Sequence, residues 1–343
     1  MKKIILIVVL TGLIAGAVGA WIFLGPGTGF SDKSGVLYIR SDAATKEAVM
    51  DSIARNEIVS NEKAFEMLAG QMDYWKSVKP GKYVIKKGTS LLSIVRMLRN
   101  GKQTPVDLTI TKLRTKEDFS RLAGRKFEFD SSRMMEFFND PDSMKKFGVL
   151  PETALWNVLP DTYTYYWTAT PSQVYKKLKE ESEKFWTDER KGKSASLGLT
   201  PLEVYILASI IEEETTNHAE KDTIASVYLN RLKIGMPLQA DPTLKFAAKN
   251  FALKRIAGEI LKIESPYNTY VNKGLPPGPI ATPSRTTIDK VLNPASTSYL
   301  YFVAKPKLGG HLFSSTYQEH LRKRADYLAA DKIRLEKEKK STR

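Results

Sequence analysis

Three consecutive glutamates end an apolar segment in the stretch LASIIEEETTNHAEKD, which begins at Leu207. On a helix, spacings of three, four and seven residues place Glu214 on the same stripe as the apolar side chains before it. The same phase turns Glu212 and Glu213 away from the centre of that stripe, so we expect both to be solvated. The pattern therefore predicts that one carboxyl group of the three faces inward.

An inward Glu214 could act as a proton donor, because removal of water penalises the ionised carboxylate and raises its pKa. A carboxyl group that keeps its proton near neutral pH can pass it to a leaving oxygen, as in cleavage of a glycosidic bond. An inward glutamate near a helix end is more often paired with a cation, and Arg231 or Lys221 could serve here. Helical phase alone leaves both interpretations open.

The helix that would position these glutamates is predicted over Pro201–Thr215. Thr200 suits its N-cap, proline is favoured in the first turn, and Glu203 stands where it can close a capping box. A second helix is predicted over Ile224–Leu232, closed by Gly235. These signals define the start of the helix clearly and place the glutamates at its C-terminal end.

Polar side chains follow these helices on predicted loops. The first loop is kinked by Pro242 and carries Gln239, Asp241 and Thr243. The second is rich in proline and glycine, runs from Ser265 to Ile288, and carries Tyr267, Asn268, Thr269 and Tyr270. Rigid loops dense in hydroxyl and amide groups suit hydroxyl-rich ligands such as glycans, although an ordinary surface connection has the same composition.

Strand signals come last in this part of the chain. Tyr299–Ala304 and His311–Ser314 flank a Gly-Gly turn and predict a β-hairpin.

The part of the chain before the glutamate helix carries three further signals. Pro171–Thr187 has the spacing of a basic amphipathic helix, and Gly192–Gly198 is predicted to be a loop. The aromatic segment WNVLPDTYTYYW, residues 156–167, is predicted to belong to the core, with a sugar-stacking wall as the functional alternative.

The N-terminus carries an uncharged apolar run from Ile4 to Gly25, long enough to cross a bilayer as a helix. Lys2 and Lys3 precede it, which places the N-terminus in the cytoplasm and the rest of the chain outside the inner membrane. Small residues near position 20 also allow a cleaved signal peptide. Because the apolar run continues through Leu24, we favour an uncleaved anchor.

Composition narrows the possible partners and cofactors. Lys and Arg exceed Asp and Glu by 53 to 38, a net charge of +15 that suits a polyanionic partner such as nucleic acid, anionic lipid or cell-wall polymer. Because an exported chain does not share a compartment with nucleic acid, we expect no nucleic-acid partner. The absence of cysteine excludes disulfides, thiolate metal sites and a cysteine nucleophile. Three scattered histidines do not suggest a metal site, and no cofactor is expected.

A strand–turn–helix unit occupies residues 79–102. A strand over Lys82–Ile85 leads through a glycine turn to a helix capped by Thr89 or Ser90 and stopped at Asn100-Gly101. This unit resembles half of a LysM-type glycan-binding module, although any small α/β packing unit has a similar pattern.

Three segments in one order carry a more specific resemblance. SIIEEETTNHAEKDTIASVYLNRLKIGMPLQADPT, SPYNTY…GLPPGPIATPS and YLYFVA…GGHLFS resemble the diagnostic core of the endolytic murein transglycosylase (YceG-like) family. The resemblance implies an α+β fold with an N-terminal transmembrane helix, a small LysM-like module and a larger mixed α+β catalytic domain. The expected boundaries are 1–25 for the anchor, 26–35 for a linker, 36–104 for the LysM-like module, 105–329 for the catalytic domain and 330–343 for a charged tail.

The resemblance also implies a reaction and its residues. The family cleaves the β-1,4 bond between N-acetylmuramic acid and N-acetylglucosamine within glycan strands and leaves 1,6-anhydromuramoyl ends. Its catalytic glutamate precedes a threonine and matches Glu214, and the first glutamate of its motif matches Glu212. Arg231 is a possible partner of Glu212. Substrate contacts, or roles in orienting Glu214, are expected of Glu212, Asn230, Gln239, Asp241, Thr243, Tyr267, Asn268 and Thr269.

The expected setting is the bacterial inner membrane, with a single span and a periplasmic catalytic domain that ends nascent strand elongation. The expected partners are peptidoglycan glycan strands, the inner membrane and peptidoglycan synthases. Two alternatives remain: a hydrolytic muramidase, for which Asp241 is the nearby candidate second carboxylate, and a non-catalytic peptidoglycan-binding scaffold.

Overall fold

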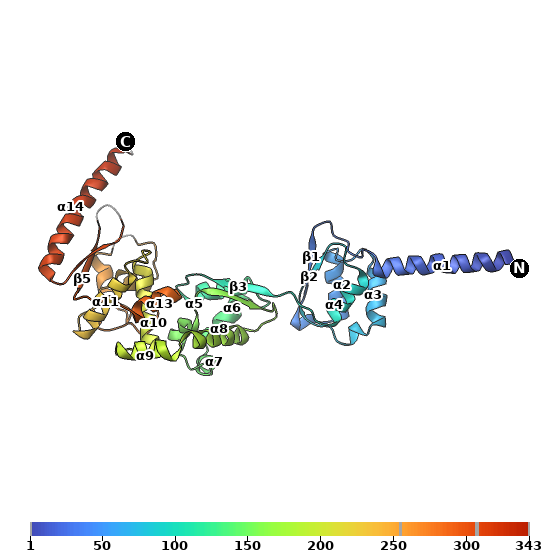
Figure 1. The fold of residues 1–343 in the computed structure, drawn as a ribbon, viewed down its shortest axis with the longest axis horizontal. Helices are drawn as coiled ribbons and strands as arrows, with labels where there is room; N and C mark the ends of the chain where they lie inside the picture. The colour runs from blue at the N-terminus through green and yellow to red at the C-terminus, as the bar shows by residue number, and fades with distance from the viewer. Residues whose placement is uncertain (1, 254–255, 306–308, 342–343) are drawn as a thin grey trace. The chain divides into compact units, whose positions relative to one another are not determined.

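The computed structural model describes residues 2–253, 256–305 and 309–341 and has a mixed α+β fold (Figure 1). The chain divides into two compact units. Unit 1 comprises residues 1–108, 122–131 and 163–171, and unit 2 comprises residues 109–121, 132–162 and 172–343.

Helix α1 (Lys2–Leu24) is a 23-residue apolar helix near the N-terminus, with none of its residues buried (Figure 1). At about 1.5 Å per residue, a helix of this length exceeds the roughly 30 Å of a bilayer's hydrocarbon core. By length and composition, α1 is therefore a candidate membrane span.

Unit 1 is built on a short antiparallel sheet, in which Leu37 of the first strand faces Tyr83 of the second. Both side chains are fully buried among the side chains of three helices. Each of these helices begins with a side-chain N-cap, at Thr45, Asn61 and Ser90. The elements are β1 (Ser34–Ile39), η1 (Ser41–Ala43), α2 (Lys46–Arg55), α3 (Glu62–Gln71), η2 (Tyr74–Lys76), β2 (Gly81–Lys86) and α4 (Leu91–Arg99). The predicted strand–turn–helix unit is present as β2 and α4, while its glycan-binding role stays a prediction.

The next elements are a second two-stranded sheet and a run of short helices. The sheet pairs β3 (Val106–Ile110) with β4 (Asp161–Tyr165). The helices are α5 (Lys116–Gly124), α6 (Ser131–Asn139), α7 (Pro141–Lys145), η3 (Pro151–Asn157), α8 (Pro171–Phe185) and α9 (Asp188–Ser196).

The C-terminal part carries the glutamate helix and the predicted hairpin. Its elements are α10 (Pro201–Glu214), α11 (Lys221–Lys233), α12 (Asp241–Ala247), η4 (Gly258–Lys262), α13 (Arg285–Leu292), β5 (Tyr301–Ala304), β6 (His311–Ser314) and α14 (Tyr317–Ser341). Strands β5 and β6 pair antiparallel, which confirms the hairpin, and its first strand begins two residues later than predicted.

Helix α10 lies in the core of unit 2, where eight consecutive residues from Val204 to Ile211 are buried. The Tyr205 hydroxyl donates to the carbonyls of Leu155 and Val158 at 2.9 and 2.6 Å. Trp156 packs with its ring centroid 5.8 Å from that of Trp186. The first part of the aromatic segment therefore anchors α10, as the core interpretation predicted.

The prediction that Gly192–Gly198 forms a loop is wrong for its first five residues, which belong to α9. Thr187 caps this helix by accepting from the amide of Arg190, and the Arg190 side chain pairs with Asp289 of α13 at 2.8 Å. Gly192 weakens a helix only modestly, so this tertiary anchor outweighs the local preference for a loop.

Candidate functional site

Helix α10 sets the positions of the three glutamates. Thr200 accepts from the amide of Glu203, and the Glu203 carboxylate accepts from the Thr200 amide at 2.7 Å, which is the predicted capping box. The helix ends at Glu214, one residue earlier than predicted. All three terminal glutamates are half-buried.

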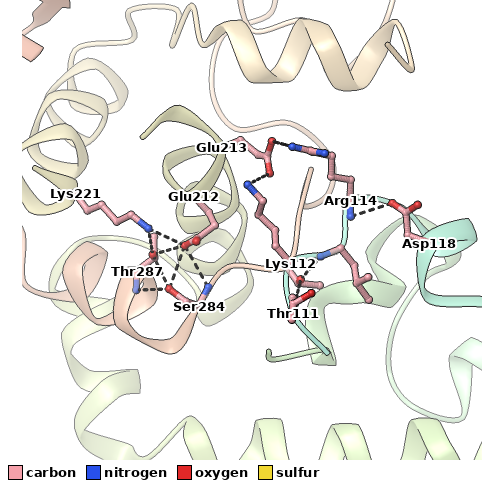
Figure 2. A network of polar contacts seen from close by, with 11 residues as sticks. Thr111, Lys112, Arg114, Asp118, Glu212, Glu213, Lys221, Ser284 and Thr287 are labelled. Carbon is pink, nitrogen blue, oxygen red and sulfur yellow. Dashed lines mark hydrogen bonds and ion pairs between the residues drawn. The ribbon is translucent and has the colours of Figure 1, made fainter. Parts of the chain in front are cut away.

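Glu212 lies in a polar network with residues of α11 and α13 (Figure 2). It accepts from Lys221 Nζ at 3.0 Å, from Ser284 Oγ at 3.1 Å and from the Thr287 hydroxyl. Burial alone would raise its pKa, but the hydrogen bonds from Thr287 and Lys221 outweigh burial and lower it. Glu212 is thus an ionised structural carboxylate that joins three helices.

Glu213 is held by two cations from the segment after β3 (Figure 2). Lys112 Nζ lies 2.8 Å from one carboxylate oxygen and Arg114 lies 2.9 Å from the other. Only 11% of the Glu213 side chain is exposed, against 16% for Glu212. The prediction that both are solvated is wrong, because helical phase describes the faces of one helix and says nothing of distant segments that cover them.

Glu214 has a different environment from its two neighbours. Its Oε2 atom is buried and has no hydrogen-bond partner among the described residues. Burial raises the pKa of Glu214 to about 8, and the negative charge of Asp241 adds to the rise, while Lys245 and Arg231 oppose it. A carboxyl group in this state keeps its proton at neutral pH.

Neither cation proposed as a partner of Glu214 forms an ion pair with it. Lys221 is engaged by Glu212 instead. Arg231 donates to the backbone carbonyls of Leu300 at 2.6 Å and Leu238 at 2.7 Å, so the expected Arg231–Glu212 pair is also wrong. Arg231 is only 6% exposed, and its guanidinium group donates hydrogen bonds to backbone carbonyls of two loop segments. Helical periodicity could not indicate these contacts.

Glu214 lines a pocket of about 350 Å³ within unit 2. Its walls come from α10, α11, the start of α12, the hairpin and α14. The lining residues are Glu214, Arg231, Gln239, Asp241, Tyr270, Tyr301, Phe302, Val303, Ala304, His311, Tyr317 and His320. The pocket therefore brings together three predicted site residues, Glu214, Gln239 and Asp241.

Asp241 is the second carboxyl group of this pocket. It accepts a hydrogen bond of 2.5 Å from the Tyr270 hydroxyl, whose pKa is raised by burial and by this carboxylate. The prediction that Asp241 and Thr243 lie on a loop is wrong, since both belong to α12. Pro242 occupies the first turn, where proline lacks only an amide that the helix does not use.

Three further predicted residues, Thr243, Asn268 and Thr269, do not line the pocket but form buried contacts next to it. Thr269 accepts from the Ala240 amide at 3.0 Å, and its hydroxyl lies 2.9 Å from that of Thr243. The Asn268 side chain donates to the carbonyls of Leu261 and Ile263, both at 3.0 Å. The Thr269 contacts hold the 265–270 loop against the start of α12, which carries Asp241, and the Asn268 contacts tie the same loop to the segment before it.

The other predicted residues lie away from the pocket lining. Asn230 donates to the carbonyls of Thr297 and Tyr299, at 2.9 and 3.0 Å. Tyr267 packs on Phe246 with a centroid distance of 4.7 Å and lines a separate hollow of about 210 Å³. Glu212 sits in its own ionic network, as described above.

Several lining residues were not predicted. Tyr301, Phe302 and His311 lie on the hairpin, and Tyr317 and His320 on α14. The Gly-Gly turn and the following histidine were a signal for the hairpin, but not for its proximity to α10.

Among the described residues, no group of three or more histidine, aspartate or glutamate side chains could hold a metal ion.

Comparisons with known proteins cover most of the chain. The model of the YceG-like family matches residues 37–326. A Bacillus subtilis protein named endolytic murein transglycosylase is 28% identical over 300 residues, which are 82% of each chain. A Streptococcus pneumoniae protein of the same name is 34% identical over 137 residues, 39% of this chain and 25% of that protein. A crystal structure of a YceG-like protein from Listeria monocytogenes, at 24% identity and a TM-score of 0.55, covers 85% of this chain and 99% of its own, and so shares the fold.

Proposed function

Because the chain belongs to the YceG-like family, and relatives from two organisms are named endolytic murein transglycosylases, we propose that it is a lytic transglycosylase acting within peptidoglycan glycan strands. One observation carries the proposal: Glu214 keeps its proton at neutral pH while lining a pocket. Such a group suits protonation of a glycosidic oxygen.

The proposed reaction begins with Glu214 as general acid. It donates its proton to the oxygen that leaves C1 of N-acetylmuramic acid, and the C6 hydroxyl of the same sugar closes onto C1. The product is a 1,6-anhydromuramoyl end, and no water is consumed. An attached nucleophile gains an effective molarity of order 10⁵ M or more in favourable cases, so the substrate itself supplies much of the acceleration.

Hydrolysis is the rival that a specific observation favours, because Asp241 lines the same pocket as Glu214. A glycosidase needs a second carboxyl group as nucleophile or base. The hydrogen bond from Tyr270 to Asp241 would orient such a group. The two mechanisms differ in their product, since hydrolysis adds one water for each bond cleaved and leaves a reducing end in place of the anhydro end.

The proposed setting follows from α1. We propose that α1 anchors the chain in the bacterial inner membrane, with Lys2 and Lys3 in the cytoplasm and the two units in the periplasm. Glycan strands emerge on that side of the membrane, so an anchored endolytic enzyme could end the elongation of nascent strands. Association with peptidoglycan synthases, and glycan binding by the LysM-like part of unit 1, belong to the same proposal.

Product analysis on defined glycan strands tests the function. Purified full-length protein in detergent is incubated with strands of known length, and the new ends are identified by mass spectrometry. We expect anhydro ends from the wild type and none from Glu214→Gln, which is similar in size and cannot donate an acidic proton. Reducing ends would establish the hydrolase, and sacculus binding without any new ends would establish the scaffold.

A matched control separates chemistry from folding. Glu259→Gln changes an acidic side chain of unit 2 that is 90% exposed and does not line the Glu214 pocket. This control is expected to match wild-type activity. If Glu214→Gln keeps activity while folded, the assignment of Glu214 fails.

A further inference from the structure

A carboxylate and an imidazole meet at the edge of the Glu214 pocket. Glu220 lies just before α11, and its Oε2 atom is 2.8 Å from Nδ1 of His311 on β6. Its Oε1 atom accepts from the His311 backbone amide at 3.2 Å and from the side chain of Asn217 at 2.7 Å. The side chains of His311 and Glu220 are only 15% and 12% exposed. Three donors therefore hold one carboxylate against the hairpin.

The backbone at Gly310 is adapted to this contact. A Cβ atom at this position would lie 1.9 Å from Oε1 of Glu220, and the residue has a φ of +90°. Both facts favour glycine, because it alone leaves the space and tolerates this φ. The close approach of Glu220 to the hairpin is thus built into the backbone of the turn.

The contact determines which nitrogen of His311 is free. A carboxylate accepts hydrogen bonds, so Glu220 favours the tautomer that carries its proton on Nδ1. Nε2 is then an acceptor, and it has no hydrogen-bond partner among the described residues. His311 lines the pocket that Glu214 lines. An imidazole oriented by a carboxylate is a common arrangement of a general base.

Starting from the proposed function, we propose that His311 is a second catalytic residue, the base that takes the proton of the muramoyl C6 hydroxyl, and that Glu220 is its positioning residue. Glu214 begins the reaction as an acid and holds its own proton at that moment. Nε2 of His311 takes the proton of the C6 oxygen when O6 closes onto C1, so that the Glu214 carboxylate does not have to serve as that base.

The atoms balance over two stages, because O6 reaches C1 on the face from which the leaving oxygen departs and closes only after the C1–O bond has broken. The O–H bond of Glu214 breaks as the leaving oxygen takes its proton and the electron pair of the C1–O bond. An electron pair of O6 forms the new bond to C1, and the O6 proton passes to Nε2 of His311. The protein is left with an ionised Glu214 and a protonated His311. Return of one proton from His311 to Glu214 restores both groups without consuming water.

Other charged and titratable groups pair with His311 or line the same pocket, and they belong to its pH response. Glu220 comes from the segment before α11, Arg231 from α11, Glu214 from α10 and Asp241 from α12. The neighbouring hairpin and α14 contribute Tyr301, Tyr317 and His320, and the 265–270 loop contributes Tyr270. Substitution of His311 therefore has to be compared with wild type over a full pH range rather than at one pH.

His311→Asn is the decisive variant, because the asparagine amide can donate to Glu220 from near the position of Nδ1 but offers no basic nitrogen in place of Nε2. Initial rates of anhydro-end release are measured from pH 5 to 9 with full-length protein and glycan strands of defined length. We expect kcat to fall by about 10²-fold or more with KM within about threefold, and the acidic limb of the kcat profile to disappear. Thermal unfolding is expected to stay close to that of wild type.

Glu220→Gln gives the second readout, since glutamine can still accept from Nδ1 but has no charge. Loss of the negative charge makes the imidazole a weaker base, so the acidic limb should move to lower pH. A role limited to holding the hairpin would not move it. Wild-type kcat and an unchanged acidic limb in His311→Asn would overturn the inference while leaving the proposed function intact. Absence of anhydro ends from wild-type protein would overturn both.

Discussion

Replacement of Glu214 by glutamine should stabilise the protein, and the gain should grow with pH. The folded structure raises the pKa of Glu214 from its ordinary 4.5 to about 8, chiefly by burial. The neutral form is therefore favoured in the folded state. The contribution of this group to stability is fully present below pH 4.5 and is lost progressively as the pH rises towards 8. Glutamine stays neutral throughout and removes this dependence.

The size of the effect follows from the same interval. In the unfolded chain Glu214 ionises above its ordinary pKa of 4.5, whereas in the folded state it stays protonated up to about pH 8. At about 1.4 kcal/mol per pH unit, the interval from pH 4.5 to pH 7 corresponds to a loss of roughly 3 kcal/mol in the free energy of unfolding. Because Glu214 is half-buried and solvent screens part of the penalty, we expect Glu214→Gln to be more stable than wild type by roughly 1 to 3 kcal/mol at pH 7. Near pH 4.5 the two proteins should differ little.

Urea unfolding between pH 4.5 and 9 measures this difference, with tryptophan fluorescence as the signal. Trp156 and Trp186 pack against the core around α10, in the same unit as Glu214. The exposed control Glu259→Gln should follow the wild-type curve at every pH. Parallel curves for wild type and Glu214→Gln between pH 5 and 8 would refute the argument that burial keeps Glu214 protonated.

Three further predictions concern activity, packing and location. The rate of anhydro-end release should fall as the pH rises above about 8, because Glu214 then loses the proton that it donates; the pH–rate profile of the wild type checks this. Lys221→Met should destabilise the protein by about 3 to 5 kcal/mol in urea unfolding, since it leaves Glu212 half-buried without its cation. Lys262→Met, in an exposed pair, should cost about 1 kcal/mol or less. Deletion of residues 2–24 should move the protein from the membrane to the soluble fraction on centrifugation, and continued sedimentation with membranes would contradict an anchoring role for α1.

Local signals in the sequence were sufficient for much of the secondary structure. Thr200, Pro201 and Glu203 specify the start of α10 through contacts within a few residues, and the structure has the same capping box. Ser90 begins α4 as a side-chain N-cap that accepts from the amide of Ser93. The length and composition of the apolar N-terminal run likewise predicted a helix, which is present as α1. Caps, turns and apolar periodicity act over one or two helical turns, so they can be recognised without tertiary contacts.

The environments of the glutamates were decided by distant parts of the chain. All three belong to one helix end, yet Lys112 and Arg114 pair with Glu213, and Lys221 pairs with Glu212. In the part of the chain that the structure describes, no cation forms an ion pair with Glu214.

The sequence by itself determined which helix carries three carboxyl groups and which of them continues its apolar stripe. Only the tertiary structure decided which of them lines a pocket and lacks an ion-pair partner among the described residues, because those properties depend on α12, the hairpin and α14, segments that helical phase does not describe.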